Sequence, residues 1–325
     1  MSENGLQREF QRKFIHYAKA KQWSQYEELK AKVREGVLFP AIRENTLDFY
    51  CGGQRALRRT RDTYKSNDWF LNGGRRENGA GSKDISFRTF PHKNENNETV
   101  TLKDILDRCK TRAKVGNTEG YQLSKIFKYF SFASIHADRN SLILIDVEAR
   151  FAPLDKRKSN NNFDMVDLVF LLPGKRELLF VEGKRRGDDR IRKCAGKYPE
   201  VRGQVQGYRE QLEKRKNQIL NAYKQASDAM DEIFGFTFIA PKSMLPDVPI
   251  LVVGDSDDEK ELRPRKHSND KWLEPMLEDV PDNTCKIWQK DDVWLMDARA
   301  VFVDFPNGVR KFAQGLNELA DKVRR

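Results

Sequence analysis

The sequence has few of the side chains that build zinc sites and disulfide frameworks. Its 325 residues include four cysteines and four histidines, and no two cysteines form a Cys-x-x-Cys pair. Zinc sites and disulfide-bonded domains need such residues in a recognisable spacing pattern. We therefore expect no zinc cluster, and free thiols in a reducing compartment. The cysteines are Cys51, Cys109, Cys194 and Cys285.

Long apolar runs are also missing. No segment approaches the roughly 20 apolar residues that a membrane-spanning helix needs. The first residues, MSENGLQREFQRKF, lack the apolar core of a signal peptide. We therefore expect a cytoplasmic protein without a membrane partner.

Acidic residues are fewer than basic ones, 49 against 60, which gives a net charge of +11. With 38% apolar and 34% charged residues, the chain has the composition of a globular but unusually polar protein. A basic excess predicts an acidic partner, and nucleic acid is the commonest. A protein whose surface is simply basic is the alternative, and charge alone does not separate the two.

Residues 1–98 are expected to form a basic N-terminal module with a linker. Apolar residues at helical spacing predict a helix from Leu6 to about Arg34, and the residues up to 59 alternate like a small meander of strands. Residues 72–98, rich in Gly, Asn, Arg and Lys, predict a loop. Basic residues near Tyr64 and Trp69 suit a nucleic-acid surface or, equally, a solvated strand face. The basic residues proposed for such a surface are Arg55, Arg58 and Arg59.

Residues 99–325 are expected to form a second domain, a mixed α/β sheet flanked by helices. Thr99 or Thr101 can cap its first helix, which runs to about Val115. Asp146 and Glu148 lie on an expected strand, where they could support a metal ion, but they are interpreted as exposed strand charges. The expected helices cover 118–135, 199–234 and a C-terminal segment that includes 312–323, and the expected strands cover 141–151, 236–240 and 249–253.

The stretch 163–184, FDMVDLVFLLPGKRELLFVEGK, predicts two apolar strands joined by a tight turn. If residues 173–176 form the turn, Leu172 pairs with Glu177, and counting outward places Asp167 opposite Glu182. Directly opposed residues have Cβ atoms about 4.5–5.5 Å apart on the same face. Two carboxylates so close repel each other unless a cation lies nearby.

A hard divalent cation suits this pair of carboxylates. Mg²⁺, or Mn²⁺ in its place, would be held by Asp167, Glu182 and the carbonyl of Gly183, with waters and substrate phosphate completing its shell. Lys184 shares a strand face with Glu182 and would hold a phosphate oxygen or orient a water. These residues indicate metal-assisted phosphodiester hydrolysis. An ordinary ion pair between Asp167 and Lys184 at a sheet edge is the alternative.

The strand Asp followed fifteen residues later by Glu-x-Lys resembles the PD-(D/E)xK nuclease superfamily, whose fold is that of restriction endonucleases. Gln204 and Tyr208, four apart on the next helix, resemble the QxxxY element of the subset akin to the exonuclease part of recombination helicases. The resemblance covers roughly residues 118–254. It implies catalytic roles for Asp167, Glu182, Lys184, Gln204 and Tyr208.

Three departures from the family pattern concern the acidic residues. Val166 stands where the family has Pro, and Asp164 competes with Asp167 for the metal-binding role. Many members also carry a Glu on the helix before the first strand. Glu119 is the candidate for that position, although at the start of a helix it also suits the helix dipole.

Together these features predict a Mg²⁺-dependent deoxyribonuclease, an endonuclease rather than an exonuclease, acting in restriction, antiviral defence or repair. Arg185 and Arg186 would extend its contact with DNA, and RNA remains an open substrate. The apolar seam of 201–233 could also pair two copies of the chain. A nucleic-acid-binding protein that has lost catalysis is the alternative, and a structural partner protein is a third.

Overall fold

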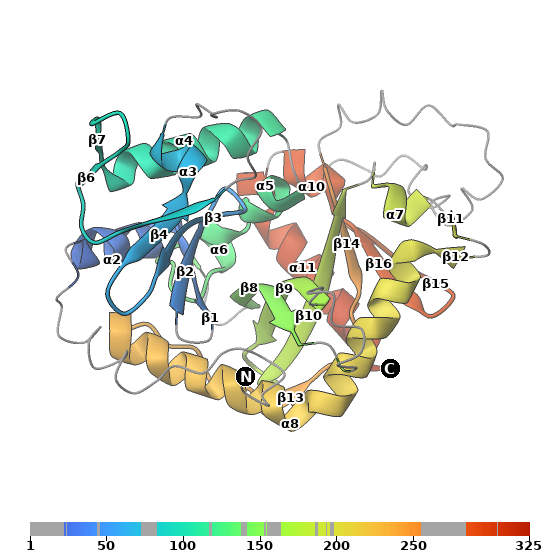
Figure 1. The fold of residues 1–325 in the computed structure, drawn as a ribbon. Helices are drawn as coiled ribbons and strands as arrows, with labels where there is room; N and C mark the ends of the chain where they lie inside the picture. Colours follow the sequence, from blue (N-terminus) through green and yellow to red (C-terminus); the bar gives the residue numbers. More distant parts are fainter. Residues whose placement is uncertain are drawn as a thin grey trace. The chain divides into compact units, whose positions relative to one another are not determined.

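The computed structural model describes residues 23, 25–43, 46–72, 83–116, 119–137, 142–152, 154, 164–185, 188–192, 194–195, 198–254, 284–303 and 305–325. The described residues form two compact units, whose helices and strands are labelled in Figure 1. Unit 1 takes its described residues from Asp138–Asn221 and Ile239–Arg325, and unit 2 takes them from Gln7–Ala137 and Ala222–Phe238.

This division differs from the expected boundary between 98 and 99. Helix α4 (Leu102–Gly116) packs on the N-terminal sheet, where the Cys109 thiol donates to the Cys51 carbonyl over 3.0 Å. At Gly52, whose φ is +57°, an added Cβ would lie 3.0 Å from the side chain of Ala113. Residues on both sides of position 98 therefore share one core.

Unit 2 is built on a five-stranded antiparallel sheet in the order β1-β2-β3-β4-β5. The predicted meander is confirmed, and the predicted helix is confirmed for α2 (Tyr26–Arg34); residues 6–22 lie outside the described residues. Gly36, with φ +70°, follows the end of α2. The strands are β1 (Phe39–Arg43), β2 (Thr46–Cys51), β3 (Gln54–Arg59), β4 (Tyr64–Asn67) and β5 (Asp84–Phe87).

Two predictions for unit 2 are wrong. Residues 72–98 are not all loop, because β5 pairs with β4 and buries Phe87, whose ring stacks on Tyr64 with centroids 5.7 Å apart. The helix expected over 118–135 is broken into α5 (Glu119–Ser124) and α6 (Phe127–Phe130), joined by i→i+3 bonds from Lys125 and Ile126. The remaining elements are α3 (Asp68–Leu71), β6 (His92–Lys93) and β7 (Thr99–Val100).

Thr101 is the cap of α4. The backbone N–H of Asp104 donates to its hydroxyl over 3.2 Å, and the Asp104 carboxylate accepts from the backbone N–H of Thr101 over 2.8 Å. This reciprocal pair satisfies two donors that the start of a helix leaves open. Thr99 lies in β7 instead.

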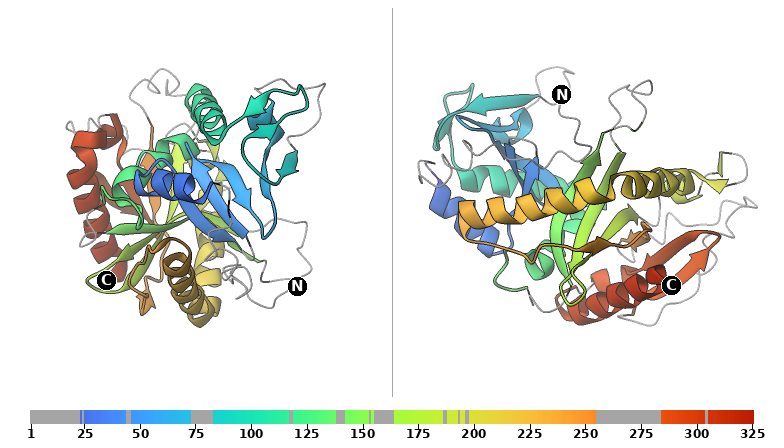
Figure 2. Two further views of the ribbon diagram at one scale, coloured as in Figure 1. Left: turned by 90° about the vertical axis from the view of Figure 1, so that its left-hand side faces the viewer. Right: turned by 90° about the horizontal axis from the view of Figure 1, so that it is seen from below.

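Unit 1 is a mixed sheet in the order β15-β16-β14-β10-β9-β8, with β13 paired to β10. β8, β9 and β10 are antiparallel, whereas β10, β14 and β16 are parallel. Helices α10 and α11 pack against β14–β16 (Figure 2). The strands are β8 (Ile143–Phe151), β9 (Asp164–Leu172), β10 (Glu177–Arg185), β13 (Ser243–Met244), β14 (Ile250–Val253), β15 (Lys286–Lys290) and β16 (Val293–Asp297).

The elements that carry the predicted site are confirmed. β9 and β10 form a hairpin around a turn at 173–176, with Leu172 paired to Glu177 as counted from the sequence. The long helix runs as α8 (Glu200–Phe234), with a kink at Arg215, and Gly235 follows it at φ +69°. The other helices are α7 (Asp189–Arg192), α10 (Arg299–Val303) and α11 (Phe305–Arg324), and a further short ladder joins β11 (Cys194–Ala195) to β12 (Tyr198–Pro199).

The strand expected over 236–240 is wrong. Those residues form no strand. In unit 2, the ring of Phe236 instead packs on Phe234 and the ring of Phe238 packs on Phe132. Across the described residues, no helix is long and apolar enough to cross a membrane.

Candidate active site

The site lies where β9 and β10 separate. Their backbone pairing runs as far as Leu168 opposite Val181. Beyond that point the Asp167 carboxylate accepts a hydrogen bond from the backbone N–H of Gly183 over 2.8 Å, so a side chain replaces a rung of the ladder. β10 continues beside β14, with Lys184 in register with Val252.

Glu182 and Lys184 form a buried ion pair on the same strand face. The Lys184 ammonium donates to Oε1 of Glu182 and, over 2.7 Å, to the carbonyl of Gly183. Their side chains are only 2% and 1% exposed. The sequence placed these two side chains on one face, and the structure brings them into contact.

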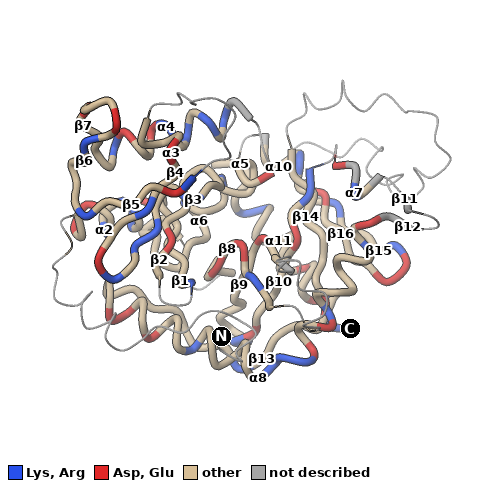
Figure 3. Tube along the Cα trace, in the orientation of Figure 1, with Lys and Arg blue, Asp and Glu red and all other residues tan. Residues whose placement is uncertain are grey.

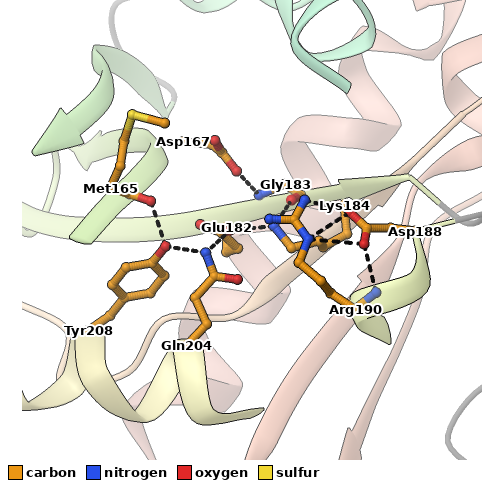
Figure 4. Close-up of polar contacts among 9 residues, drawn as sticks. All are labelled: Met165, Asp167, Glu182, Gly183, Lys184, Asp188, Arg190, Gln204 and Tyr208. Carbon is orange, nitrogen blue, oxygen red and sulfur yellow. Dashed lines mark hydrogen bonds and ion pairs between the residues drawn. The ribbon is translucent and has the colours of Figure 1, made fainter. Parts of the chain in front are cut away.

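Gln204 and Tyr208 reach the site from α8 (Figure 4). The Gln204 amide donates to Oε1 of Glu182 over 2.7 Å and to the Tyr208 hydroxyl over 2.5 Å. That hydroxyl donates to the carbonyl of Met165 on β9, also over 2.5 Å. The two residues therefore link α8 to both strands of the hairpin and fix the direction of the Glu182 carboxylate.

Two arginines of α8, Arg202 and Arg209, hold this helix in place through ion pairs. Arg209 bonds to Asp247 over 2.5 Å and to the carboxylate of Asp292 over 2.6 Å. Arg202 bonds to the other carboxylate oxygen of Asp292 over 2.7 Å. Because Arg209 adjoins Tyr208, these contacts anchor the helix beside the site to the β15–β16 turn.

The carboxyl group of Asp167 has an unusual environment. Burial raises its pKa most, and the negative charge of Glu182 raises it further. The charge of Lys184 and the Gly183 N–H lower it by less, so the pKa of Asp167 reaches about 8. Without a cation, Asp167 is therefore largely protonated at neutral pH.

The donor atoms suit a hard cation. Asp167 and Glu182 offer carboxylate oxygens and Gly183 a carbonyl oxygen, which is the chemistry that Mg²⁺ prefers. Among the described residues, no three His, Cys, Asp or Glu side chains gather as a ligand set. Two carboxylates are enough for Mg²⁺, which keeps waters and substrate phosphates in its shell. The competing Asp164 stands at the start of β9, opposite Phe151.

The two acidic residues of β8 are not simply exposed. Asp146 is buried, with a carboxylate oxygen accepting from the backbone N–H of Val147 over 2.9 Å, at a shift of register in β8. Glu148 has a φ of +47° and lies beside Asp167, whose pKa its charge also raises. The prediction of exposed strand charges is wrong for Asp146, because the irregular register turns it inward.

Two further residues next to the site were not singled out in the sequence. Asp188 follows β10, and its backbone N–H donates to the Arg185 carbonyl over 2.9 Å. Arg190 chelates the Asp188 carboxylate through Nε and Nη2, over 3.0 and 2.6 Å (Figure 4). The basic segment after Lys184 was the signal that could have identified them.

Basic residues lie along β3 in unit 2 (Figure 3), and their side chains contact acidic or aromatic residues. Arg55 bonds to Asp84 over 2.5 Å, and Arg58 grips both carboxylate oxygens of Asp48 over 2.6 and 2.7 Å.

Arg59 is buried, with its guanidinium over the rings of Tyr64 and Trp23. It therefore stabilises this sheet and is not part of a solvent-facing surface. In unit 1, Arg185 ends β10, and Arg186 lies outside the described residues.

Comparisons with protein-family models, with curated proteins and with solved structures found no match to this chain.

The raised pKa of Asp167 predicts a pH-dependent stability. The folded carboxyl holds its proton up to about pH 8, whereas the ordinary value is 3.8, so its contribution is complete below pH 3.8 and is lost as pH rises through 8. Asp167→Asn mimics the protonated form. In metal-free buffer, urea unfolding should show the variant gaining stability relative to wild type from pH 5 to pH 9. Parallel pH profiles would contradict the assigned pKa.

The buried ion pair predicts a large loss when one partner is removed. Lys184→Met leaves the Glu182 carboxylate buried without its ammonium, which should cost about 3–5 kcal/mol of unfolding free energy. The double variant Glu182→Gln/Lys184→Met should recover much of that loss in urea unfolding. Lys175→Ala, which breaks an exposed pair with Asp321, serves as the control and should cost less than about 1 kcal/mol. Equal losses in the single and double variants would exclude the coupling.

Proposed function

We propose that the chain is a Mg²⁺-dependent nuclease that hydrolyses phosphodiester bonds of DNA. The observation that carries this proposal is a charge imbalance at the point where β9 and β10 separate. The Lys184 ammonium pairs with Glu182, and burial of Asp167, followed by the negative charge of Glu182, raises the pKa of Asp167 to about 8. A divalent cation with a phosphate would occupy such a place more favourably than a proton.

Asp167, Glu182 and the Gly183 carbonyl are the groups that would hold the ion. When bound, Mg²⁺ would lower the pKa of a water and offset the charge that develops on the phosphate oxygens. Asp167 must lose its proton to act as a ligand. The Gly183 N–H, which donates to Oδ2 of Asp167, keeps that carboxylate directed at β10.

Lys184 acts as a hydrogen-bond donor to the reacting groups. Its ammonium already lies against Glu182 and the Gly183 carbonyl, so it would exchange one of these contacts for a phosphate oxygen or the attacking water. Hydrolysis then joins the water oxygen to phosphorus while the P–O ester bond breaks. A preorganised donor of this kind is worth about 10²–10³ in rate.

Gln204 and Tyr208 act as positioning residues. Gln204 donates to Glu182 itself, and Tyr208 orients Gln204 through a bond that ends on Met165. Burial, followed by the nearby negative charge of Glu182, raises the pKa of Tyr208, so its hydroxyl stays protonated and donates.

The order of elements supports a restriction-endonuclease-like core. In chain order, the three antiparallel strands β8, β9 and β10 are followed by helix α8 and the parallel strand β14, with the short elements α7, β11, β12 and β13 between them, and α6 of unit 2 precedes β8. The net charge of +11 suits DNA as the polyanion.

A second candidate is a nucleic-acid-binding protein without catalysis. One observation favours it: Lys184 and Glu182 are almost fully buried, as they would be in a purely structural ion pair. In that case DNA binding would need no metal and would survive changes at either residue.

The test is a cleavage assay on circular, linear and single-stranded DNA with Mg²⁺ or Mn²⁺. An endonuclease should open the circular substrate. Asp167→Ala, Glu182→Gln and Lys184→Met should each lower the cleavage rate at least about 100-fold, because each removes a group that acts on the ion or the phosphate. Circular dichroism must show that each variant is folded.

Lys175→Ala is the matched control, since it removes a lysine from the hairpin turn at the other end of β10. It should cleave at the wild-type rate. Metal-independent binding without cleavage of any substrate would support the second candidate and reject the first.

A further inference from the structure

Arg190 has an exposed side chain whose guanidinium is held in a fixed direction near the candidate active site. Its Nε and Nη2 chelate Asp188, and its backbone N–H also donates to Asp188 Oδ1 over 2.8 Å. The Arg190 side chain nevertheless keeps 45% of its surface exposed, whereas Asp188 is largely buried. Because this guanidinium is already held in place, it would lose less conformational entropy when a ligand binds.

The position of this pair is set by β10. The Asp188 N–H bonds to the carbonyl of Arg185, so Asp188 lies one tight turn beyond Lys184. The charges confirm the proximity: burial raises the pKa of Asp188, but its bonds to Arg190 and the positive charge of Lys184 lower it by more. Arg190 is therefore bonded to Asp188, whose pKa the positive charge of Lys184 lowers.

A second Asp-x-Arg pair in the same sheet shows what a structural version looks like. At the end of β16, Arg299 chelates Asp297 with the same pattern of bonds, from its backbone N–H, Nε and Nη2. In register, Asp297 aligns with Val252 and so with Lys184, at the same edge of the sheet. Arg299, however, is only 14% exposed.

The bonds alone are thus explained by the start of a helix, as α7 and α10 each begin beside their pair. The start of a helix does not explain the difference in exposure, because the Arg190 side chain is 45% exposed and the Arg299 side chain only 14%. Arg is the side chain best suited to grip a phosphate with two parallel hydrogen bonds.

We propose that Arg190 binds a backbone phosphate of the nucleic acid next to the phosphate that is hydrolysed, with Asp188 holding the guanidinium in position. This inference rests on the proposed function. It names the contact that aligns the substrate with Lys184, and it adds a residue to the proposed site.

The test measures DNA binding without cleavage. Fluorescence anisotropy with a labelled short duplex, in EDTA and over a series of NaCl concentrations, gives the slope of log K against log salt. Arg190→Ala should reduce that slope by about one, because one phosphate contact is lost. Arg190→Gln keeps a donor for Asp188 but no charge, and should reduce the slope equally, whereas Arg190→Lys should keep it.

Lys175→Ala, which removes one charge from the hairpin turn at the other end of β10, should leave the slope unchanged. An unchanged slope in folded Arg190→Ala and Arg190→Gln, or an equal loss in Lys175→Ala, would overturn the inference while leaving the proposed nuclease intact. Failure of the wild type to bind DNA would reject the proposed substrate and this contact with it.

Discussion

The site depends on one physical constraint: two carboxyl groups, Asp167 and Glu182, lie buried beside the ammonium of Lys184. Lys184 bonds to Glu182, whereas Asp167 accepts a hydrogen bond from the Gly183 N–H. Burial and the charge of Glu182 then raise the pKa of Asp167 to about 8. A proton on Asp167 restores the balance in the metal-free protein, and a divalent cation together with an anionic phosphate would restore it when substrate is bound. The proposed chemistry follows from this imbalance.

The surrounding fold serves to maintain that constraint. β10 remains paired with β14 even where it has separated from β9, so the backbone of Lys184 stays within the sheet. Gln204 fixes the carboxylate of Glu182, and the arginines of α8 fix the helix that carries Gln204. Buried charges need such partners, since a charge left unpaired in the interior costs several kcal/mol.

Much of the site could be predicted from the sequence, because it depends on local rules. The two-residue period of a strand placed Glu182 and Lys184 on one face, and the four-residue turn set the pairing of Leu172 with Glu177. Features that depend on distant contacts could not be predicted. Asp146 is turned inward by a register shift, and Arg59 is buried under the ring of Tyr64, its partner on the neighbouring strand, and under that of Trp23, 36 residues earlier in the chain.

A measurement of Mg²⁺ binding by isothermal titration calorimetry tests the central claim most directly. At pH 7, in two buffers of different ionisation enthalpy, wild type should bind Mg²⁺ and release about one proton per ion, because the ion displaces the proton of Asp167. Asp167→Asn should bind the ion weakly and release none. Absence of binding by the folded wild type, or binding without proton release that persists in Asp167→Asn, would contradict the account.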